Sequence, residues 1–358
     1  MPSIWDPIKI GRMTLNHRFA MAPLTRSRAG ADGAPGPLAA EYYGQRASLG
    51  LLISEGTQPS EDGQGFPNTP GVYTDDHVAG WRRVVSSVHA GGGRLFIQLM
   101  HAGRMSHPDN TPHHRDPVAP SAIAAQASVF TFDGLKDAPT PRALSLDDIK
   151  TTIADFRHAA LCSIEAGADG VEIHGANGYL LQQFFSPNAN VRADRYGGSI
   201  ENRARLGVEV AAEVAAAVGP DRVGIRLSPG SRLGDIDEGP DVAAFYLHLV
   251  GELAKLDLAY LHIAHGGDDD LLRRIREAWP KALLVTRINR PLEDAASDVE
   301  SGLADMAPVG RWALANPDFI DRFKHGAALN APDPETFYGR GARGYTDYPR
   351  LNEASAAA

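Results

Sequence analysis

Three hydrogen-bonding side chains fall within six residues of the chain, at His174, Asn177 and Tyr179. They follow an apolar stretch predicted to be a β-strand (170–173), so they occupy the point where a strand gives way to a loop. In parallel α/β folds this end of a strand carries the chemistry. His174 and Asn177 could donate to one ligand oxygen, and Tyr179 could give a proton to a neighbouring carbon. In the alternative, structural interpretation, His174 and Asn177 bond loop backbone groups and Tyr179 packs against the rim.

Further polar and small residues stand at the ends of other predicted strands. They are Pro23, Leu24 and Thr25 after the first strand, Gly56 after the second, Gln98 at the end of the third, Arg226 in the fifth, and Gly310 and Arg311 after the eighth. Their donors and acceptors suit a planar heterocycle with several carbonyl and imide groups. A phosphate would complete such a ligand, because barrels often bind one after strands seven and eight.

Two arginines indicate where negative charge would lie. Gly310 permits close backbone approach and Arg311 offers a bidentate fork for a phosphate, although a surface salt bridge is the alternative for Arg311. Arg226 lies inside a predicted strand, where a guanidinium is costly unless an anionic group faces it. That group is either a ligand or a structural carboxylate, and the sequence leaves both open.

The elements that must position these residues form a repeating pattern of strand and helix. Eight strands are predicted, at 18–22, 51–54, 95–98, 170–173, 223–227, 260–264, 283–286 and 306–309. This indicates an α/β fold, a (β/α)8 TIM barrel, in one domain over residues 1–358. Helical spacing is clearest at 149–166 and 200–218, and Gly219 should stop the second helix. A doubly wound dinucleotide fold competes, but no predicted strand is followed by Gly-x-Gly-x-x-Gly.

Three segments lie outside the repeat. Residues 7–15, within an N-terminal unit of about 1–17, resemble a small hairpin that could plug the lower end of the barrel. The connection from 101 to about 143 is too long for an ordinary loop, and its alternating stretch at 128–132 predicts a hairpin or flap over the pocket. The tail, about 332–358, carries Tyr338, Tyr345 and Tyr348 and should wrap the barrel, with its last residues disordered.

Composition and charge narrow the class of protein. The chain has 358 residues, 43% of them hydrophobic, which is ample for a large core. A net charge of −9 without runs of lysine or arginine argues against nucleic-acid and membrane partners and favours a small-molecule enzyme. The single cysteine, Cys162, should pack within a helix. No segment approaches the ~20 apolar residues of a membrane span and no targeting pattern opens the chain, so we expect a cytoplasmic protein. The sequence predicts no oligomeric state.

Two other classes of barrel enzyme can be weighed from single residues. No lysine ends a predicted strand, which argues against a Schiff-base aldolase. A metal-dependent hydrolase would use His262, His265 and His174, but the His-x-His pair typical of the first strand of such barrels is absent. We therefore expect no metal and interpret His262 as a satisfied core histidine.

Several longer motifs then stand out, at 23–26, at 98–104, at 174–179 continuing into Gln183 and Phe184, at 195–203 and at 315–318. In type, order and spacing they resemble the old yellow enzyme family of flavin-dependent ene-reductases, from the N-terminal hairpin to Tyr348. The resemblance implies FMN bound across the barrel mouth and NAD(P)H as the reductant. The implied cofactor-binding residues are Pro23, Leu24, Thr25, Gly56, Gln98, Arg226, Asn289, Gly310 and Arg311.

The resemblance also implies a mechanism. NAD(P)H reduces the flavin and leaves, and an activated alkene takes its place. His174 and Asn177 bind the carbonyl or nitro oxygen of an α,β-unsaturated substrate, the flavin passes a hydride to the β-carbon, and Tyr179 protonates the α-carbon. Arg226 faces the part of the ring where reduced flavin accumulates negative charge. Met100 contributes to the substrate pocket.

Three residues depart from the family pattern. Met100 stands where many relatives have tryptophan, so the pocket wall is softer. Ile288 lies where relatives usually have a glycine-containing loop, and a β-branched residue adopts positive φ only at a cost. Pro308 removes a hydrogen-bond donor from the last strand. The last two departures predict weaker FMN retention and support a third hypothesis, a flavin-binding protein that has lost turnover.

Overall fold

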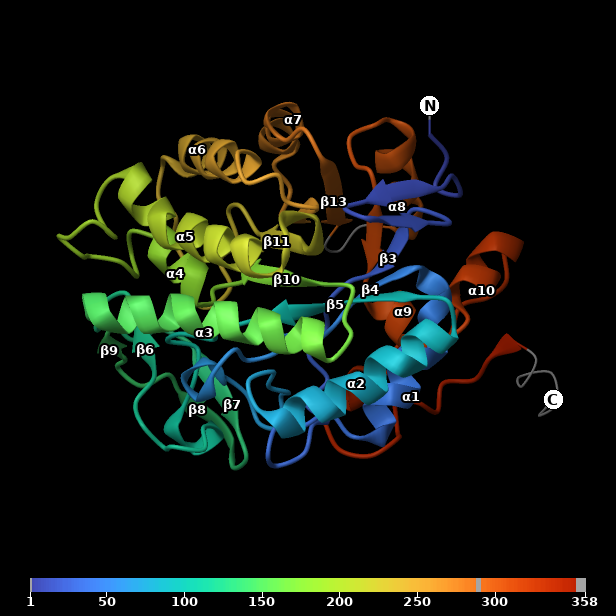
Figure 1. Cartoon of the computed structure of the whole chain (residues 1–358), viewed down its shortest axis with the longest axis horizontal. Helices are drawn as coiled ribbons and strands as arrows, with labels where there is room; N and C mark the ends of the chain where they lie inside the picture. The colour runs from blue at the N-terminus through green and yellow to red at the C-terminus, as the bar shows by residue number, and fades with distance from the viewer. Residues whose placement is uncertain (1, 288–290, 352–358) are drawn as a thin grey trace.

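The barrel is formed by eight parallel strands with helices around them (Figure 1). The computed structural model describes residues 2–287 and 291–351. The strands are β3 (Phe19–Met21), β4 (Leu51–Ile53), β5 (Arg94–Leu99), β10 (Gly170–Gly175), β11 (Val223–Leu227), β12 (Tyr260–His265), β13 (Ala282–Arg287) and β14 (Ala307–Val309). They neighbour one another in the order β13-β12-β11-β10-β5-β4-β3-β14. The predicted TIM barrel is confirmed.

The observed strand boundaries differ from the predicted ones by at most two residues, and β11 has the predicted bounds. The largest difference is in β10, which continues through Gly175, so that His174 lies within the strand and not after it. The cause is pairing with β11, where His174 lies opposite Arg226 and Gly175 lies opposite Leu227. Hydrogen bonds to the neighbouring strand thus extend β10 beyond its apolar run.

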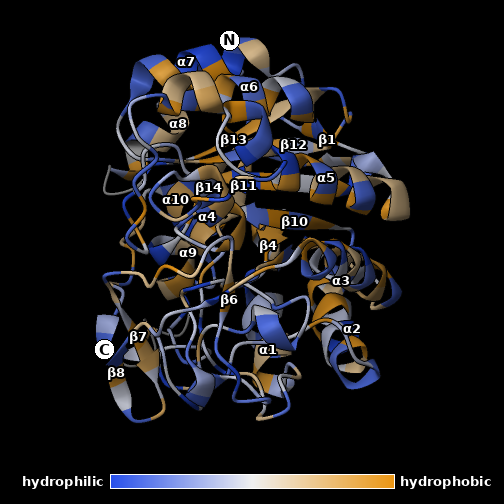
Figure 2. Cartoon of the chain, turned by 90° about the vertical axis from the view of Figure 1, so that its left-hand side faces the viewer, coloured by the Kyte–Doolittle hydropathy of each residue, from blue (hydrophilic) through white to orange (hydrophobic). Residues whose placement is uncertain are grey.

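The helices carry both hydrophobic and hydrophilic residues, as α2, α3 and α7 show in Figure 2. They are α1 (Pro37–Gln45), α2 (Asp75–Ala90), α3 (Leu146–Glu165), α4 (Leu180–Phe185), α5 (Ile200–Val218), α6 (Val242–Ala254), α7 (Asp269–Ala278), α8 (Leu292–Glu300), α9 (Arg311–Ala315) and α10 (Phe319–His325). In the described part of the chain, no helix has both the length and the apolar character that crossing a membrane requires.

Local sequence sets where the two longest helices begin and end. α3 starts three residues before the predicted position because Ser145 and Asp148 form a capping box that satisfies free N–H groups of the first turn. α5 has the predicted bounds, and it ends at Gly219, whose φ of 95° suits glycine. Cys162 is buried in α3 within the hydrophobic core, as predicted.

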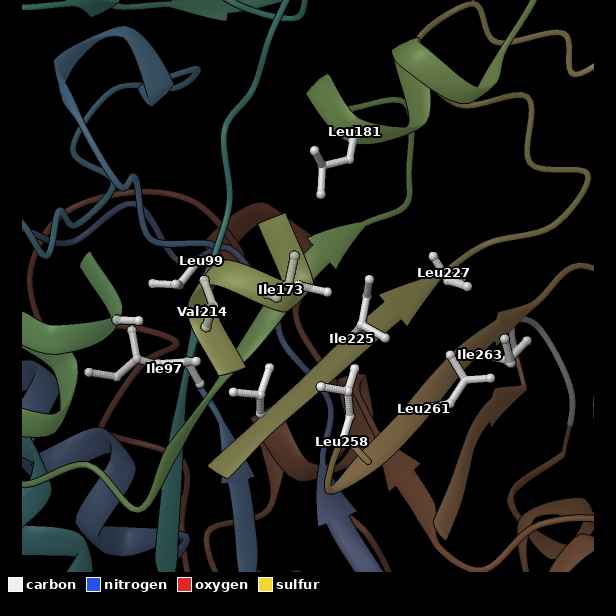
Figure 3. Packing of buried hydrophobic residues seen from close by; sticks show 14 of the residues in the cluster. Ile97, Leu99, Ile173, Leu181, Val214, Ile225, Leu227, Leu258, Leu261 and Ile263 are labelled. Carbon is white, nitrogen blue, oxygen red and sulfur yellow. The ribbon is translucent and has the colours of Figure 1, made fainter. Parts of the chain in front are cut away.

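The barrel strands separate two hydrophobic clusters. Side chains that point outward from the strands, such as Ile173 and Ile225, pack against helices, and Figure 3 shows them near Val214 of α5. The second cluster fills the lower interior and includes Phe96, Tyr260 and residues of an antiparallel hairpin. That hairpin comprises β1 (Ile8–Ile10) and β2 (Met13–Leu15). The predicted N-terminal plug is therefore confirmed.

The barrel is nearly, but not completely, closed. Within the described residues β13 and β14 meet at one isolated bridge, between Leu284 and Met306. Ala307 donates its N–H to Arg18 on the β3 side, so the nitrogen of the following residue faces β13. That residue is Pro308, which has no N–H to donate. The predicted departure at Pro308 thus explains why no ladder forms across this seam.

Two further segments reach the mouth of the barrel. The long connection after β5 contains a short parallel pair, β6 (Val118–Ala119) with β9 (Arg142–Ala143), and the predicted hairpin, β7 (Ser128–Thr131) with β8 (Gly134–Asp137). The tail packs Tyr345 on Tyr42, with ring centroids 4.1 Å apart. Arg26, in the loop after β3, donates to the Gly344 carbonyl at 2.6 Å, so the tail wraps the barrel as predicted.

Candidate active site

A layer of polar side chains fills the barrel interior above the hydrophobic plug. Side chains alternate along a strand, so Glu172 and His174 of β10 point inward while Ile173 points outward. On the neighbouring strands, Gln98 lies opposite Glu172 and Arg226 lies opposite His174. His262 of β12 lies opposite Arg226. Parallel pairing thus brings these predicted residues into two adjacent layers of one interior.

Glu172 is the centre of the lower polar layer. Gln98 Nε2 donates to its Oε1 at 2.8 Å, and the Tyr260 hydroxyl donates to its Oε2 at 3.1 Å. His262 Nδ1 lies 2.8 Å from Oε2, while His262 Nε2 lies 2.7 Å from the Thr286 hydroxyl. His262 is therefore fully hydrogen-bonded, which confirms its interpretation as a satisfied core histidine.

The charges of the two polar layers balance each other. Burial pushes the pKa of the Glu172 carboxyl upward, but His262, Arg226 and Gln98 bring it below its ordinary value, so the group is ionised. Burial lowers the pKa of His262, which fits a neutral ring that donates through Nδ1. Arg226 remains a cation, although burial lowers its pKa while Glu172 acts in the opposite direction. Glu172 thus acts on Arg226 through its charge, but no hydrogen bond or ion pair joins the two in the described structure, so Arg226 remains available for a ligand.

The loop after β10 is fixed by buried glutamines. Gln182 accepts the N–H of Gly178 at 2.8 Å and donates to the Ser228 carbonyl at 3.1 Å. Gln183 donates to the Gly178 carbonyl at 2.8 Å and to the Ala102 carbonyl at 3.1 Å. A Cβ on Gly178, whose φ is +84°, would overlap the Leu233 carbonyl. The loop therefore has one conformation, held to the loops after β5 and β11.

Within this loop Asn177 adopts a left-handed φ of 57°, a conformation that asparagine tolerates better than most residues. Its backbone N–H donates to the Ser228 hydroxyl at 2.8 Å. The loop bonds described above are made by glutamine side chains and backbone groups, so they leave the Asn177 carboxamide available for a ligand.

His174 and Tyr179 lie side by side, with ring centroids 5.3 Å apart. Burial, and then the charges of Arg226 and His262, lower the pKa of His174 well below its ordinary value, so the imidazole is neutral. Burial raises the pKa of Tyr179, so the phenol keeps its proton at neutral pH. Among the described residues no group bonds to the phenol oxygen, and none bonds to His174 Nδ1.

Tyr179 faces a cavity of about 330 Å³ at the barrel mouth. Most of its lining is apolar, and it includes the β7–β8 hairpin, which places the predicted flap over the pocket. The lining residues are Thr25, Ser27, Phe66, Ser128, Phe130, Leu135, Tyr179 and Tyr338. The cavity can accept an apolar molecule with a polar end directed toward His174 and Tyr179.

The loops after β3 and β4 form the adjoining wall. Glu55 accepts the backbone N–H groups of Arg26 at 2.9 Å and Ser27 at 3.2 Å, which fixes the loop that carries Thr25. Burial raises the pKa of Glu55 to about 7 against these bonds. A Cβ on Gly56 would overlap the sulfur of Met100. Met100 is therefore buried against Gly56, at the base of the wall.

A second cavity, of about 210 Å³, lies at the β13–β14 seam and is lined by Gly310 and Arg311. A Cβ on Gly310 would lie 3.5 Å from the side chain of Leu24, the residue before Thr25 of the first cavity. Arg311 is exposed and lies over the Trp312 ring, and no carboxylate of the described residues pairs with it. Arg287 also lines this cavity, but its guanidinium is bound to Asp298 at 2.7 Å and to Asp269 at 2.6 Å. Asn289 and Ile288 lie outside the described residues.

The residues at the barrel mouth fit FMN, which consists of a flavin ring and a phosphate. His174 Nδ1 and Arg226 Nε are buried and have no partner among the described residues, which leaves donors and acceptors for a ring seated above them. Gly310 and the guanidinium of Arg311, which lies over the Trp312 ring at 5.5 Å from its centroid, suit the phosphate. A metal site is not formed: no group of three or more His, Cys, Asp or Glu side chains in the described ranges could hold a metal ion.

Comparison with known proteins identifies the family. A family model described as "NADH:flavin oxidoreductase / NADH oxidase family" matches residues 3–330. The chain belongs to this family of FMN-dependent oxidoreductases. The predicted resemblance to old yellow enzyme is confirmed.

Members of this family resemble the chain over nearly its whole length. A probable flavin mononucleotide-dependent alkene reductase of Leishmania infantum is 40% identical over 96% of both chains. The 12-oxophytodienoate reductase 2 of Arabidopsis thaliana is 40% identical over 98% of this chain and 96% of its own length. Morphinone reductase in complex with tetrahydroNAD has a TM-score of 0.94 and is 44% identical over 99% of both chains. The old yellow enzyme homologue of Zymomonas mobilis has a TM-score of 0.94 at 40% identity, over 98% of this chain and 100% of its own.

Sequence reasoning missed residues of this family member that support the predicted ones. Glu172 was part of a strand interpreted as apolar, although a carboxylate two residues before an inward-facing histidine points into the same interior. No sequence pattern indicates that Glu55, the residue before Gly56, fixes the loop after β3. Phe66 and Tyr338 reach the pocket through long connections, so only the fold brings them there.

Proposed function

We propose that the chain is an FMN-dependent ene-reductase that uses NAD(P)H to reduce α,β-unsaturated carbonyl compounds and related activated alkenes. The observation that carries the proposal is the placement of the Tyr179 phenol, to which no described residue bonds, against the His174 imidazole beside an apolar cavity. The names of the relatives, an alkene reductase and 12-oxophytodienoate reductases, support the same class of substrate.

The residues that would hold FMN lie around the mouth. Gln98 and Arg226 would face the pyrimidine edge, Thr25 and the backbone near Pro23, Leu24 and Gly56 would contact the ring, and Gly310 with Arg311 would bind the phosphate. Asn289 is proposed as a further contact from the sequence alone. When bound, FMN would accept a hydride from NAD(P)H and deliver it to the alkene β-carbon.

The substrate would be oriented by the β10 loop. His174 and Asn177 would donate hydrogen bonds to its carbonyl or nitro oxygen, which draws electron density from the alkene and favours attack at the β-carbon. Because His174 is neutral, it donates without carrying a net charge into the apolar cavity. Met100 would support the adjoining wall, which the loops after β3 and β4 form, through its contact with Gly56.

Tyr179 would complete the reaction. Its proton would move from the phenol oxygen to the substrate α-carbon, and solvent would return the proton through the open cavity. The raised pKa keeps the phenol protonated, and an enolate carbon is basic enough to accept its proton. Tyr179 thus acts only after the substrate has bound.

An anaerobic titration tests the proposal. Protein reconstituted with FMN should lose its flavin absorbance when NADH or NADPH is added, and should regain it when cyclohexenone or a maleimide follows. Comparing the two nicotinamides also identifies the preferred reductant. A protein that bleaches but does not recover with any activated alkene would instead support the hypothesis of lost turnover.

A further inference from the structure

Glu172 has no role in the reaction proposed above. Within the described residues, however, it is the barrel-interior carboxylate that accepts hydrogen bonds from three side chains. It is fully buried, and its two oxygens accept hydrogen bonds from Gln98, Tyr260 and His262. An ionised carboxylate inside a protein is costly unless such partners compensate it. Its place, one layer below His174 and opposite Gln98, puts this charge directly under the proposed flavin site.

The first consequence concerns the orientation of Gln98. A carboxylate can only accept hydrogen bonds, so the amide of Gln98 must present its NH2 group to Glu172. The carbonyl oxygen of the same planar amide then points away from Glu172. Among the described residues no donor reaches that oxygen. A ring above this layer therefore meets an acceptor, which matches an imide N–H and would repel a carbonyl.

The second consequence concerns charge. Arg226 lies opposite His174 in the layer above, and its Nε has no partner in the described structure. Glu172 lies one layer below on the paired strand, and its charge raises the pKa of Arg226 against the larger effect of burial. In an interior of low polarity, charges act on each other over longer distances than they do in water. The edge of a bound ring thus faces the Arg226 cation, and the negative charge of Glu172 partly offsets the positive charge of Arg226.

We propose that Glu172 is a positioning residue for the bound flavin: it holds the Gln98 carbonyl oxygen toward the mouth and offsets the charge of Arg226. The inference rests on the proposed FMN site and goes beyond it. Two-electron reduction adds negative charge to a flavin, so a carboxylate below the ring disfavours the reduced form. Glu172 therefore lowers the midpoint potential and makes the bound flavin a stronger donor to an alkene.

Two substitutions separate these effects in the FMN-loaded protein. Glu172→Gln removes the charge and retains the length, so the midpoint potential, measured against a reference dye, should rise. Flavin reduction by NAD(P)H should then be no slower, while alkene reduction slows about tenfold, the equivalent of about 1.4 kcal/mol. Glu172→Asp retains the charge but shortens the reach to Gln98. The potential should stay near the wild-type value, while the Kd for FMN rises about tenfold.

Glu238→Gln is the matched control. Glu238 is also a buried carboxylate that accepts from a glutamine, Gln182, and from a tyrosine, Tyr246, but it lies outside the polar layer of the barrel. Its substitution should leave the flavin potential unchanged. Equal potential shifts in Glu172→Gln and Glu238→Gln, or a shift in neither, would overturn the charge effect.

The remaining outcomes are also decisive. Unchanged FMN affinity in Glu172→Asp would overturn the positioning effect, and this variant serves alone if Glu172→Gln does not fold. A slowing of both half-reactions by the same factor would indicate a merely structural carboxylate. A wild-type chain that takes up no FMN would refute the proposed function itself, whereas an FMN protein with unmoved potentials would refute only the role of Glu172.

Discussion

The two sides of the barrel mouth are held together in different ways. Around β5, β10 and β11 the strands form continuous parallel ladders, and buried side chains such as Gln182 and Gln183 join the loops above them. Across the β13–β14 seam the described strands share one bridge, because Pro308 offers no N–H. The side that carries His174 and Tyr179 is therefore rigid before any ligand binds, whereas the seam side gains most from a ligand that spans it.

Two arginines, one on each side of the mouth, also differ in whether protein groups occupy their guanidinium. Arg287 at the seam is bound by Asp298 and Asp269, which raise its pKa and leave its guanidinium little capacity for a ligand. Arg226, on the rigid side, retains a buried Nε without a partner in the described residues. An arginine whose partners are all protein groups stabilises the fold, while one left partly unbonded in a buried site is prepared for a ligand.

The largest effect should come from the rigid side, at the proton donor. Tyr179→Phe should slow alkene reduction by about 10²–10⁴-fold, because a positioned general acid is lost. Flavin reduction by NAD(P)H should remain nearly intact, since the phenol acts only in the second half-reaction. Stopped-flow measurement of each half-reaction checks this. Tyr338→Phe, a phenol in the same cavity, is the control and should slow neither.

His174→Ala should have the next largest effect. Loss of one aimed oxyanion donor costs about 2.7–4 kcal/mol, so alkene reduction should fall by about 10²–10³-fold. Phenolic ligands, which resemble the enolate oxygen, should bind more weakly in spectral titrations. His174→Asn retains a donor and should recover part of the loss. Unchanged titrations in His174→Ala would contradict the assigned role.

Stability should depend on pH through Glu55, in the loop after β4. Because the folded pKa of about 7 lies above the ordinary 4.5, the protonated form is favoured in the folded state. The contribution of Glu55 is thus present below about pH 4.5 and is lost as pH rises through 7, by up to about 3 kcal/mol. Glu55→Gln should narrow the difference in Tm between pH 5 and pH 8. An identical pH dependence in the two proteins would refute this.

The smallest effect should be found at the β13–β14 seam, where water can replace the one contact that the substitution removes. Arg311→Ala should raise the Kd for FMN about tenfold, since it removes a charged hydrogen bond to the phosphate. Riboflavin, which lacks the phosphate, provides the control and should bind the variant and the wild type equally. Fluorescence titration of the apoprotein measures both. Equal losses for the two flavins would place the phosphate elsewhere.

The sequence predicted the parts of the molecule that depend on local patterns. The strands, the helix at 200–218, the plug hairpin and the flap follow from periodicity and turn residues, and the motif at 174–179 lies at the mouth as expected. The extension of β10 through Gly175 could not be predicted, because it depends on pairing with β11. The same limit applies to Glu172, whose partners come from strands 74 and 90 residues away in the chain.

Isotope tracing tests the central claim most directly. Reduction of a 2-substituted enone with NAD(P)H deuterated at the transferred position should place deuterium at the β-carbon of the product. The same reaction with unlabelled NAD(P)H in D2O should place it at the α-carbon, where Tyr179 delivers a proton exchanged with solvent. Deuterium from D2O at the β-carbon, or no transfer from the labelled nicotinamide, would contradict the account.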